Sequence, residues 1–295
     1  MRKIIFYFAA GCLFLSGLAG NIPEEDQELA LHHFMQGEFL VNQGNYALAI
    51  LEFQDALDLD PNAPTIHVSI ADAYHRLGKN KRAENHLQVA IELNPDEVEA
   101  YEILGKIYIL QKRLPQAEAA FRELTRLDPD NIDHLYALAD LARLLKQWDI
   151  AIDYYLEAYR VNSMAVKGLE QALQISLATN KFERAEEICD LLLEEEPENE
   201  KYLETLRDLA LFDNDFEKAL KTIQILETTR GSTIELLIQK SALYEELDDS
   251  ENALKEILKA FGRDSLNSDL LNRLVLSLIH ISEPTRRTPI SYAVL

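Results

Sequence analysis

Residues that break helices and residues that crosslink chains are both scarce in this sequence. Its 295 residues include ten glycines and nine prolines, which suits long helices joined by short turns. Two cysteines are present, Cys12 and Cys189, and Cys12 lies in an N-terminal segment that we expect to be removed. The mature chain would then hold one thiol, which excludes a fold stabilised by internal disulfides.

Positive charge is also scarce. Lys and Arg together number 29 against 51 Asp and Glu, so the formal net charge is -22 at pH 7. A chain of this charge repels nucleic acid and anionic lipid surfaces and attracts basic molecules. The composition therefore predicts a protein or peptide partner, with basic partners favoured, and no nucleic acid.

The residue patterns of known catalytic and metal sites are missing as well. There is no glycine cluster to hold phosphate, no paired-histidine zinc helix and no nucleophile elbow. His32 and His33 are adjacent, so on a helix they point about 100° apart and share no ligand face. Asp213-Asn214-Asp215 lacks the glycine and the terminal glutamate of a calcium loop. We therefore predict no enzyme activity, no cofactor and no metal.

The N-terminus has the features of a secretory signal peptide. Two basic residues precede the apolar run Ile4–Leu15, and small residues follow as far as Gly20. We expect residues 1–20 to be cleaved and the protein to be exported, to the periplasm or cell envelope of a Gram-negative bacterium. The run is short for a membrane span, so none is expected in the mature chain. A retained anchor and lipidation at Cys12 stay open as alternatives.

One pattern recurs through most of the chain. Alanine returns every 34 residues, at Ala49, Ala83, Ala117, Ala151, Ala185, Ala219 and Ala253. Proline follows the same period at Pro61, Pro95, Pro129 and Pro197. A helical period of 34 residues is typical of tetratricopeptide repeats, and the chain resembles that family over seven repeats, residues 30–267. The resemblance implies an all-α fold, a right-handed superhelical α-solenoid of antiparallel helix pairs.

Within each repeat we expect a helix A, a turn and a helix B. In the second repeat helix A is predicted from Pro64 to Leu77, and Gly78 supplies the left-handed turn. Ala71 and Ala83 are expected where the two helices approach closely. Residues 21–29 form a lead-in whose Pro23 and following acids predict an early helix start.

The last three repeats depart from the family pattern. Leu173, Arg207 and Ser241 replace the small residue of helix A, and Cys189 takes an aromatic position of helix B. We interpret Cys189 as a buried apolar residue. The segment 228–232 lacks the expected proline and is predicted to be the most flexible joint.

By the resemblance, the second, fifth, ninth and twelfth positions of each helix A line a concave binding surface. The candidate partner-binding residues are Glu38, Asp72, Glu102, Lys106, Tyr136, Asp140, Arg143, Glu170, Gln174, Glu204 and Asp208. Over all such positions eleven acids, which also include Glu99, Asp133, Glu235 and Glu245, stand against Lys106, Arg143, Lys167 and Lys201. The acids predict a basic partner, unless they only reflect the overall acidity of the chain.

The resemblance also allows one binding mode of the family to be excluded. The family's clamp for a C-terminal carboxylate needs Lys and Asn in register on successive helices. Glu38, Asp72 and Asp140 stand where asparagine is required, so that mode is not expected here.

The C-terminal tail does not resemble a natural sequence. Leu276–Arg286 matches the translation of a transposase-end adapter used for sequencing libraries, and Ile290–Val294 matches its next constant segment. We therefore expect residues 276–295 to be non-native and residues 268–275 to begin a truncated eighth repeat. The apolar stretch Leu276–Ile281 is expected to extend the last helix, and residues 282–295 to be disordered.

Three functions are compatible with these patterns. The leading prediction is a non-enzymatic exported scaffold that mediates protein–protein interaction through its concave surface. The alternative is the N-terminal periplasmic arm of a larger outer-membrane secretion or polysaccharide-export protein. The third is an array that precedes a catalytic domain. The sequence leaves the oligomeric state open.

Overall fold

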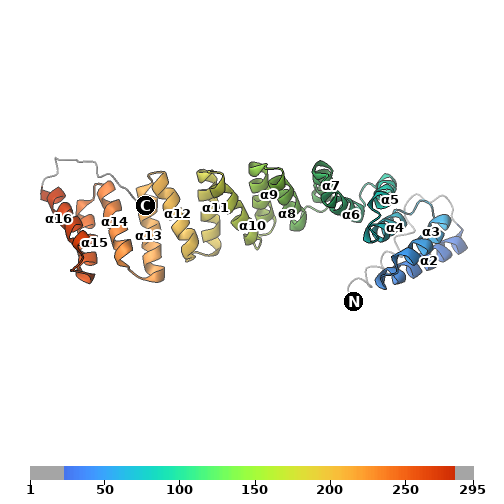
Figure 1. The fold of residues 1–295 in the computed structure, drawn as a ribbon, viewed down its shortest axis with the longest axis horizontal. Helices are drawn as coiled ribbons and strands as arrows, with labels where there is room; N and C mark the ends of the chain where they lie inside the picture. Colours follow the sequence, from blue (N-terminus) through green and yellow to red (C-terminus); the bar gives the residue numbers. More distant parts are fainter. Residues whose placement is uncertain (1–22, 283–295) are drawn as a thin grey trace. The chain divides into compact units, whose positions relative to one another are not determined.

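The chain is built almost entirely of α-helices. The computed structural model describes residues 23–282, and within them it contains fifteen helices and no strand (Figure 1). The predicted signal peptide, the Cys12 alternative and the tail after residue 282 lie outside the described residues. The predicted fold class, an all-α solenoid of antiparallel helix pairs, is confirmed.

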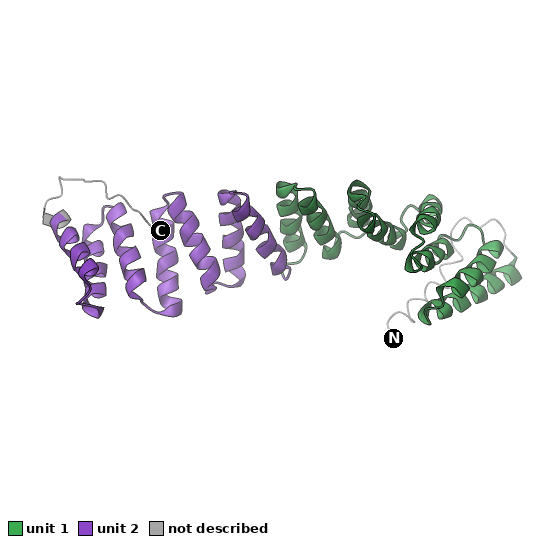
Figure 2. Cartoon of the chain, viewed as in Figure 1, with its two compact units in different colours: residues 1–163 green, residues 164–295 purple. Residues whose placement is uncertain are grey.

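The helices fall into two compact units, residues 1–163 and residues 164–295 (Figure 2). The first unit contains α2 (Glu24–Asn42), α3 (Tyr46–Leu59), α4 (Pro64–Arg76), α5 (Asn80–Leu93), α6 (Val98–Leu110), α7 (Leu114–Leu127), α8 (Ile132–Leu144) and α9 (Trp148–Val161). The second contains α10 (Val166–Ala178), α11 (Phe182–Glu195), α12 (Glu200–Phe212), α13 (Phe216–Arg230), α14 (Ile234–Glu246), α15 (Ser250–Arg263) and α16 (Ser268–Ser282). Within each unit a helix packs mainly against its neighbours in the chain, as expected of a repeat protein.

The starts of the helices follow from local chemistry. Pro23 directly precedes α2, and three acids in the first turn favour the positive end of the helix dipole. The first helix therefore begins before the formal repeat, as predicted. Pro64 opens α4, whose last helical residue is Arg76, with Leu77 as its cap.

The turn between helix A and helix B contains one left-handed residue in every repeat. In the first two repeats it is glycine, Gly44 with φ 78° and Gly78 with φ 72°. In the other five it is Lys112, Lys146, Asn180, Asn214 and Asp248, with φ between 57° and 59°. The next backbone N–H then bonds back to helix A, as from Lys79 to the carbonyl of Tyr74 at 2.9 Å. The turn geometry is constant, although glycine is not.

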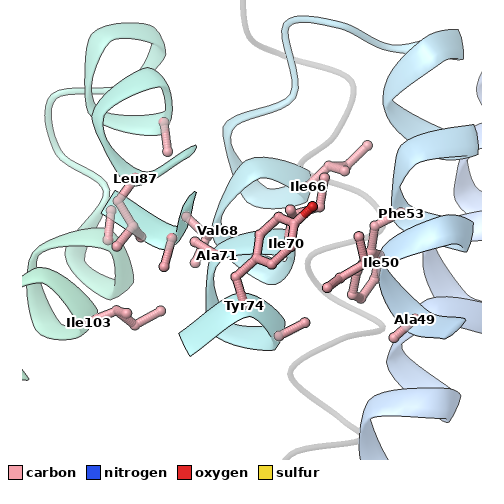
Figure 3. Close-up of a cluster of buried hydrophobic side chains, with 14 of the residues drawn as sticks. Ala49, Ile50, Phe53, Ile66, Val68, Ile70, Ala71, Tyr74, Leu87 and Ile103 are labelled. Carbon is pink, nitrogen blue, oxygen red and sulfur yellow. The ribbon is translucent and has the colours of Figure 1, made fainter. Parts of the chain in front are cut away.

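The core lies between the helices of each pair and between successive pairs. All seven periodic alanines are fully buried. Around them pack larger side chains such as Phe53, Ile66, Ile70 and Leu87, which Figure 3 shows for the first repeats. A larger side chain at an alanine position would force the helices apart, which explains why the alanine column has no exception.

A second pair of positions sets how closely helix A meets helix B. Counting from Ala30 as the first residue of repeat one, position eight faces position 24. A Cβ built on Gly37 would lie 2.5 Å from Cδ1 of Phe53, and one built on Gly105 would lie 2.8 Å from Cε2 of Phe121. At both glycines an aromatic ring therefore lies where a Cβ would need space, and the overlap is more severe at Gly37.

In repeats two and five the sizes at these two positions compensate each other. Repeat two combines Ala71 with Leu87, and repeat five combines Leu173 with the fully buried Cys189. The departure of repeat five from the family pattern is thus an exchange, in which a larger residue on helix A faces a smaller residue on helix B. The prediction that Cys189 is buried is confirmed, and burial raises the pKa of its thiol to about 12.

The last helix, α16, begins at Ser268, where an eighth repeat was expected. Leu270 and Leu274 are buried against α15. The helix continues through the apolar stretch 276–281, as predicted from its composition.

Candidate partner-binding surface

Four of the predicted surface acids lie close together in the first unit. They come from three successive A helices: Glu38 from α2, Asp72 from α4, and Glu99 and Glu102 from α6. The pKa of Glu99 is raised, first because surrounding protein displaces water from its carboxyl group, and then because Glu38, Asp72, Glu97 and Glu102 repel its negative charge. The fold therefore concentrates negative charge around an exposed carboxylate.

Two of these acids are partly neutralised by their own helix. Arg76 pairs with Asp72 at 2.7 Å, and Lys106 pairs with Glu102 at 3.2 Å, each one helical turn away. Exposed pairs of this kind contribute little to stability and are exchangeable. A cationic ligand can therefore replace the internal partner without a large loss.

On α8 the predicted residues form a local network. The hydroxyl of Tyr155 donates to Asp140 at 2.8 Å, and Arg143 approaches the same carboxylate at 3.0 Å. The Tyr136 ring lies 6.0 Å from that of Tyr155. Burial and the bond to Asp140 both raise the pKa of Tyr155. Asp140 thus joins helix A to helix B, in addition to any contact with a partner.

The predicted acids of the second unit accept bonds from neighbouring side chains. Tyr202 donates to Glu170 at 2.9 Å, and burial followed by this bond raises the pKa of Tyr202 to about 12. Arg230 pairs with Glu204 at 2.7 Å. Arg207 pairs with Asp208 at 2.8 Å and Gln174 is exposed. In this unit the acids are therefore engaged in contacts within and between helices.

The distribution of charge along the chain is a feature that counting surface positions missed. Residues 4–75 contain no Lys or Arg, while ten Asp and Glu lie between Glu24 and Asp72. Net charge alone hides this asymmetry, because every Lys and Arg beyond Lys3 lies at Arg76 or later in the chain. The strongest uncompensated negative field is consequently expected in the first repeats.

One group of possible metal ligands also escaped the sequence analysis. Nδ1 of His33 lies 2.8 Å from Glu52, and Asp55 completes a set of ligand atoms within 4.8 Å of one another. The set joins α2 to α3, so its spacing in the sequence resembles no metal motif. The hydrogen bond between His33 and Glu52 accounts for the placement of both side chains, and Asp55 is exposed. We assign no metal to it.

No helix within residues 23–282 combines the length and apolar character that crossing a bilayer requires.

Comparison with known families agrees with the repeat pattern. A model described as tetratricopeptide repeat matches residues 68–132, and a second TPR model matches residues 37–78. The chain belongs to the tetratricopeptide-repeat family. The matched residues of this TPR array include the acids of α4 and α6 described above.

Similar proteins share parts of the TPR array. DnaJ homolog subfamily C member 3 of Bos taurus is 24% identical over 232 residues, which are 79% of this chain and 42% of that protein. RNA polymerase II-associated protein 3 of Homo sapiens is 28% identical over 120 residues, 41% of this chain and 18% of that protein. The chain spans less than half the length of these curated relatives.

A solved structure agrees in fold. The structure of Naa15/Naa10 bound to HypK-THB superimposes with a TM-score of 0.56 at 14% identity, over 84% of this chain and 39% of that one. At this identity the likeness establishes the helical repeat architecture alone.

Proposed function

We propose that this TPR array is a protein-interaction scaffold whose A helices in the first three repeats bind a basic segment of a partner protein. TPR arrays typically act by binding, through surfaces formed by stacked helices. The observation that carries the proposal is the convergence of acids from three successive A helices, Glu38, Asp72, Glu99 and Glu102, around Glu99, which remains exposed. A ligand that brings positive charge relieves the repulsion among these acids.

The proposed roles follow from the contacts. Glu99 forms the centre of the site, because its ionised state gains most from a nearby cation. Glu38 is held by the hydroxyl of Ser69, which donates to it at 2.9 Å. Asp72 and Glu102 exchange Arg76 and Lys106 for lysine or arginine side chains of the partner. Such complementarity mainly raises the association rate and selects against acidic partners.

The test uses a fluorescein-labelled Arg-Gly repeat peptide and the full chain. Glu99→Gln combined with Glu102→Gln should weaken binding about tenfold at low salt, and less at high salt because exposed charges are screened. The matched control removes two carboxylates from helix B of the same repeat, Glu118→Gln and Glu123→Gln, and should bind almost normally. Equal losses in both variants would show that only net charge matters and would reject the site.

We also propose that the protein is exported. The basic residues before the apolar run Ile4–Leu15 support this, as does the row of small residues that ends at Gly20. In a Gram-negative host the protein should appear in the periplasmic fraction with a new N-terminus near Gly20 or Asn21. A soluble cytoplasmic pool whose intact mass retains Met1 would contradict export.

The alternative role, an arm of a larger outer-membrane export protein, uses the same surface. It differs in the sequence expected downstream of the array. Reading the source DNA across codon 275 separates the two, because only the alternative requires amphipathic strands there.

A further inference from the structure

Repeat one ends in a face that the other repeats bury. Position ten of helix A is apolar and buried in repeats two to seven, each residue at most 8% exposed: Ala73, Ile107, Leu141, Ile175, Leu209 and Leu243. In repeat one the same position is Phe39, and it is 56% exposed. An aromatic residue therefore stands at an interhelical packing position and stays more than half exposed among the residues that the structure describes.

Contacts in later repeats show which way this face points. Ser69, which occupies position six as Met35 does in repeat one, reaches back to Glu38 on the preceding helix A. Lys218, at the position of Leu48, reaches back to Asp190 on the preceding helix B at 2.9 Å. Both positions thus face the repeat that comes before.

Three exposed apolar side chains accordingly lie on the N-terminal side of repeat one. We call them the end face: Met35 and Phe39 on α2, with Leu48 on α3. Each is more than half exposed, at 60%, 56% and 53% respectively. A soluble protein rarely exposes several large apolar residues together unless they bind something.

The charge around the end face selects the occupant. Helices α2 and α3 contain eight Asp and Glu and neither Lys nor Arg. A second copy of this chain that docked through the same face would bring the same acids against them, and like charges would oppose that contact. The end face lies within a pair of helices whose charged residues are all acidic. It therefore complements a partner that presents an apolar surface bordered by basic residues.

We propose that the end face docks a cationic amphipathic helix of a partner protein. This helix takes the place that a preceding repeat fills elsewhere in the array. Its apolar side packs on Phe39 and on Met35, whose flexible thioether adapts to different side chains. Its lysine and arginine residues pair with the acids of α2 and α3. The apolar residues of the end face are separate from the acids of the site centred on Glu99, although Glu38 lies on α2 as well.

The experiment uses the full chain and a synthetic Leu-Lys peptide designed as an amphipathic helix, with a scrambled peptide of equal composition as control. Met35→Gln with Phe39→Gln should weaken binding of the helical peptide at least about tenfold, because aromatic anchors carry most of the energy of such contacts. Leu110→Gln with Leu144→Gln, which changes equally exposed residues of the same unit, should leave binding unchanged. Glu99→Gln should also leave it unchanged, which separates this proposal from the proposed function.

Three results would overturn the inference. Equal binding of the scrambled peptide would show attraction by charge alone. A dimer in sedimentation velocity that Phe39→Gln dissociates would make a second copy the occupant. Failure of the full chain to bind the helical peptide would show that the face is closed, by the chain's own N-terminal residues or otherwise. Circular dichroism must show unchanged helix content in each variant.

Discussion

Replacing Gly37 with alanine tests the close contact between helix A and helix B in repeat one. The added Cβ would lie 2.5 Å from Cδ1 and 2.9 Å from Cζ of Phe53, whereas ordinary van der Waals contact begins near 3.4 Å. The Phe53 ring is fully buried and packs against Phe34, with ring centroids 5.7 Å apart. A movement of the ring would therefore have to displace buried neighbours such as Phe34.

Two opposing effects determine the size of the change. Forcing an extra methyl group into a packed core costs about 1–3 kcal/mol. Alanine is favoured over glycine within a helix by about 1 kcal/mol. We therefore expect Gly37→Ala to lower the free energy of unfolding by about 1 kcal/mol. At Gly105 the nearest ring atoms lie at 2.8 and 3.0 Å, so the two effects should nearly cancel.

The measurement is a urea titration followed by circular dichroism and by fluorescence of Trp148, the only tryptophan, which reports on the first unit. Gly262→Ala is the control, because a Cβ there meets no atom within 4 Å and should stabilise its helix. Phe53→Leu should restore part of the loss in Gly37→Ala, since repeat two already pairs alanine with leucine at these positions. If Gly37→Ala stabilised the protein as Gly262→Ala does, the close contact would not exist.

Three further predictions concern charge. Burial lowers the pKa of His67 and His86, whose Nδ1 atoms lie 3.1 Å apart, so below pH 6.5 the unfolded state binds more protons than the folded state. The urea midpoint of unfolding should therefore fall as the pH drops below that value, and His86→Gln should make this fall smaller. The pKa of Glu99 is raised, so its ionisation destabilises the fold as the pH rises above 4.5, and Glu99→Gln should raise the midpoint near pH 7 but not near pH 4. Lys240→Met should cost about 3 kcal/mol because it leaves the buried Glu256, 3.4 Å away, without that partner, and adding Glu256→Gln should recover most of the loss in the same titration.

Much of the fold was predictable because it depends on a strict period. An alanine every 34 residues fixes both helices of a repeat, and all seven are fully buried. The turn was predictable where glycine marks it, at Gly78. It was not predictable at Lys112 or Lys146, because hydrogen bonds back to helix A hold the backbone in the left-handed region there even though the residue is not glycine. Only the register of the repeats locates these turns.

The positions of the candidate surface residues were predictable, but the hydrogen-bond partners of their side chains were not. Register places Glu38, Asp72 and Glu99 on successive A helices, and the structure brings their charges together. The bond from Ser69 to Glu38 joins residues 31 positions apart, and no local pattern indicates it. The end face was not predicted because Phe39 occupies a position that is buried in other repeats, so its place in the repeat pattern suggests a core residue.

The matched sizes of positions eight and 24 restrict how such a chain can recombine. Exchanging whole repeats at the segments between helix B and the next helix A keeps Gly37 and Gly105 opposite phenylalanine, and Leu173 opposite Cys189. A crossover at the turn inside a repeat does not. Joining the helix that carries Leu173 to the one that carries Phe121 would overfill the contact, and joining the helix of Gly37 to that of Cys189 would leave a void. Gene duplication and shuffling in this array should therefore exchange whole repeats. Recombination at the turn inside a repeat should be rare, because it separates positions eight and 24, which must match in size.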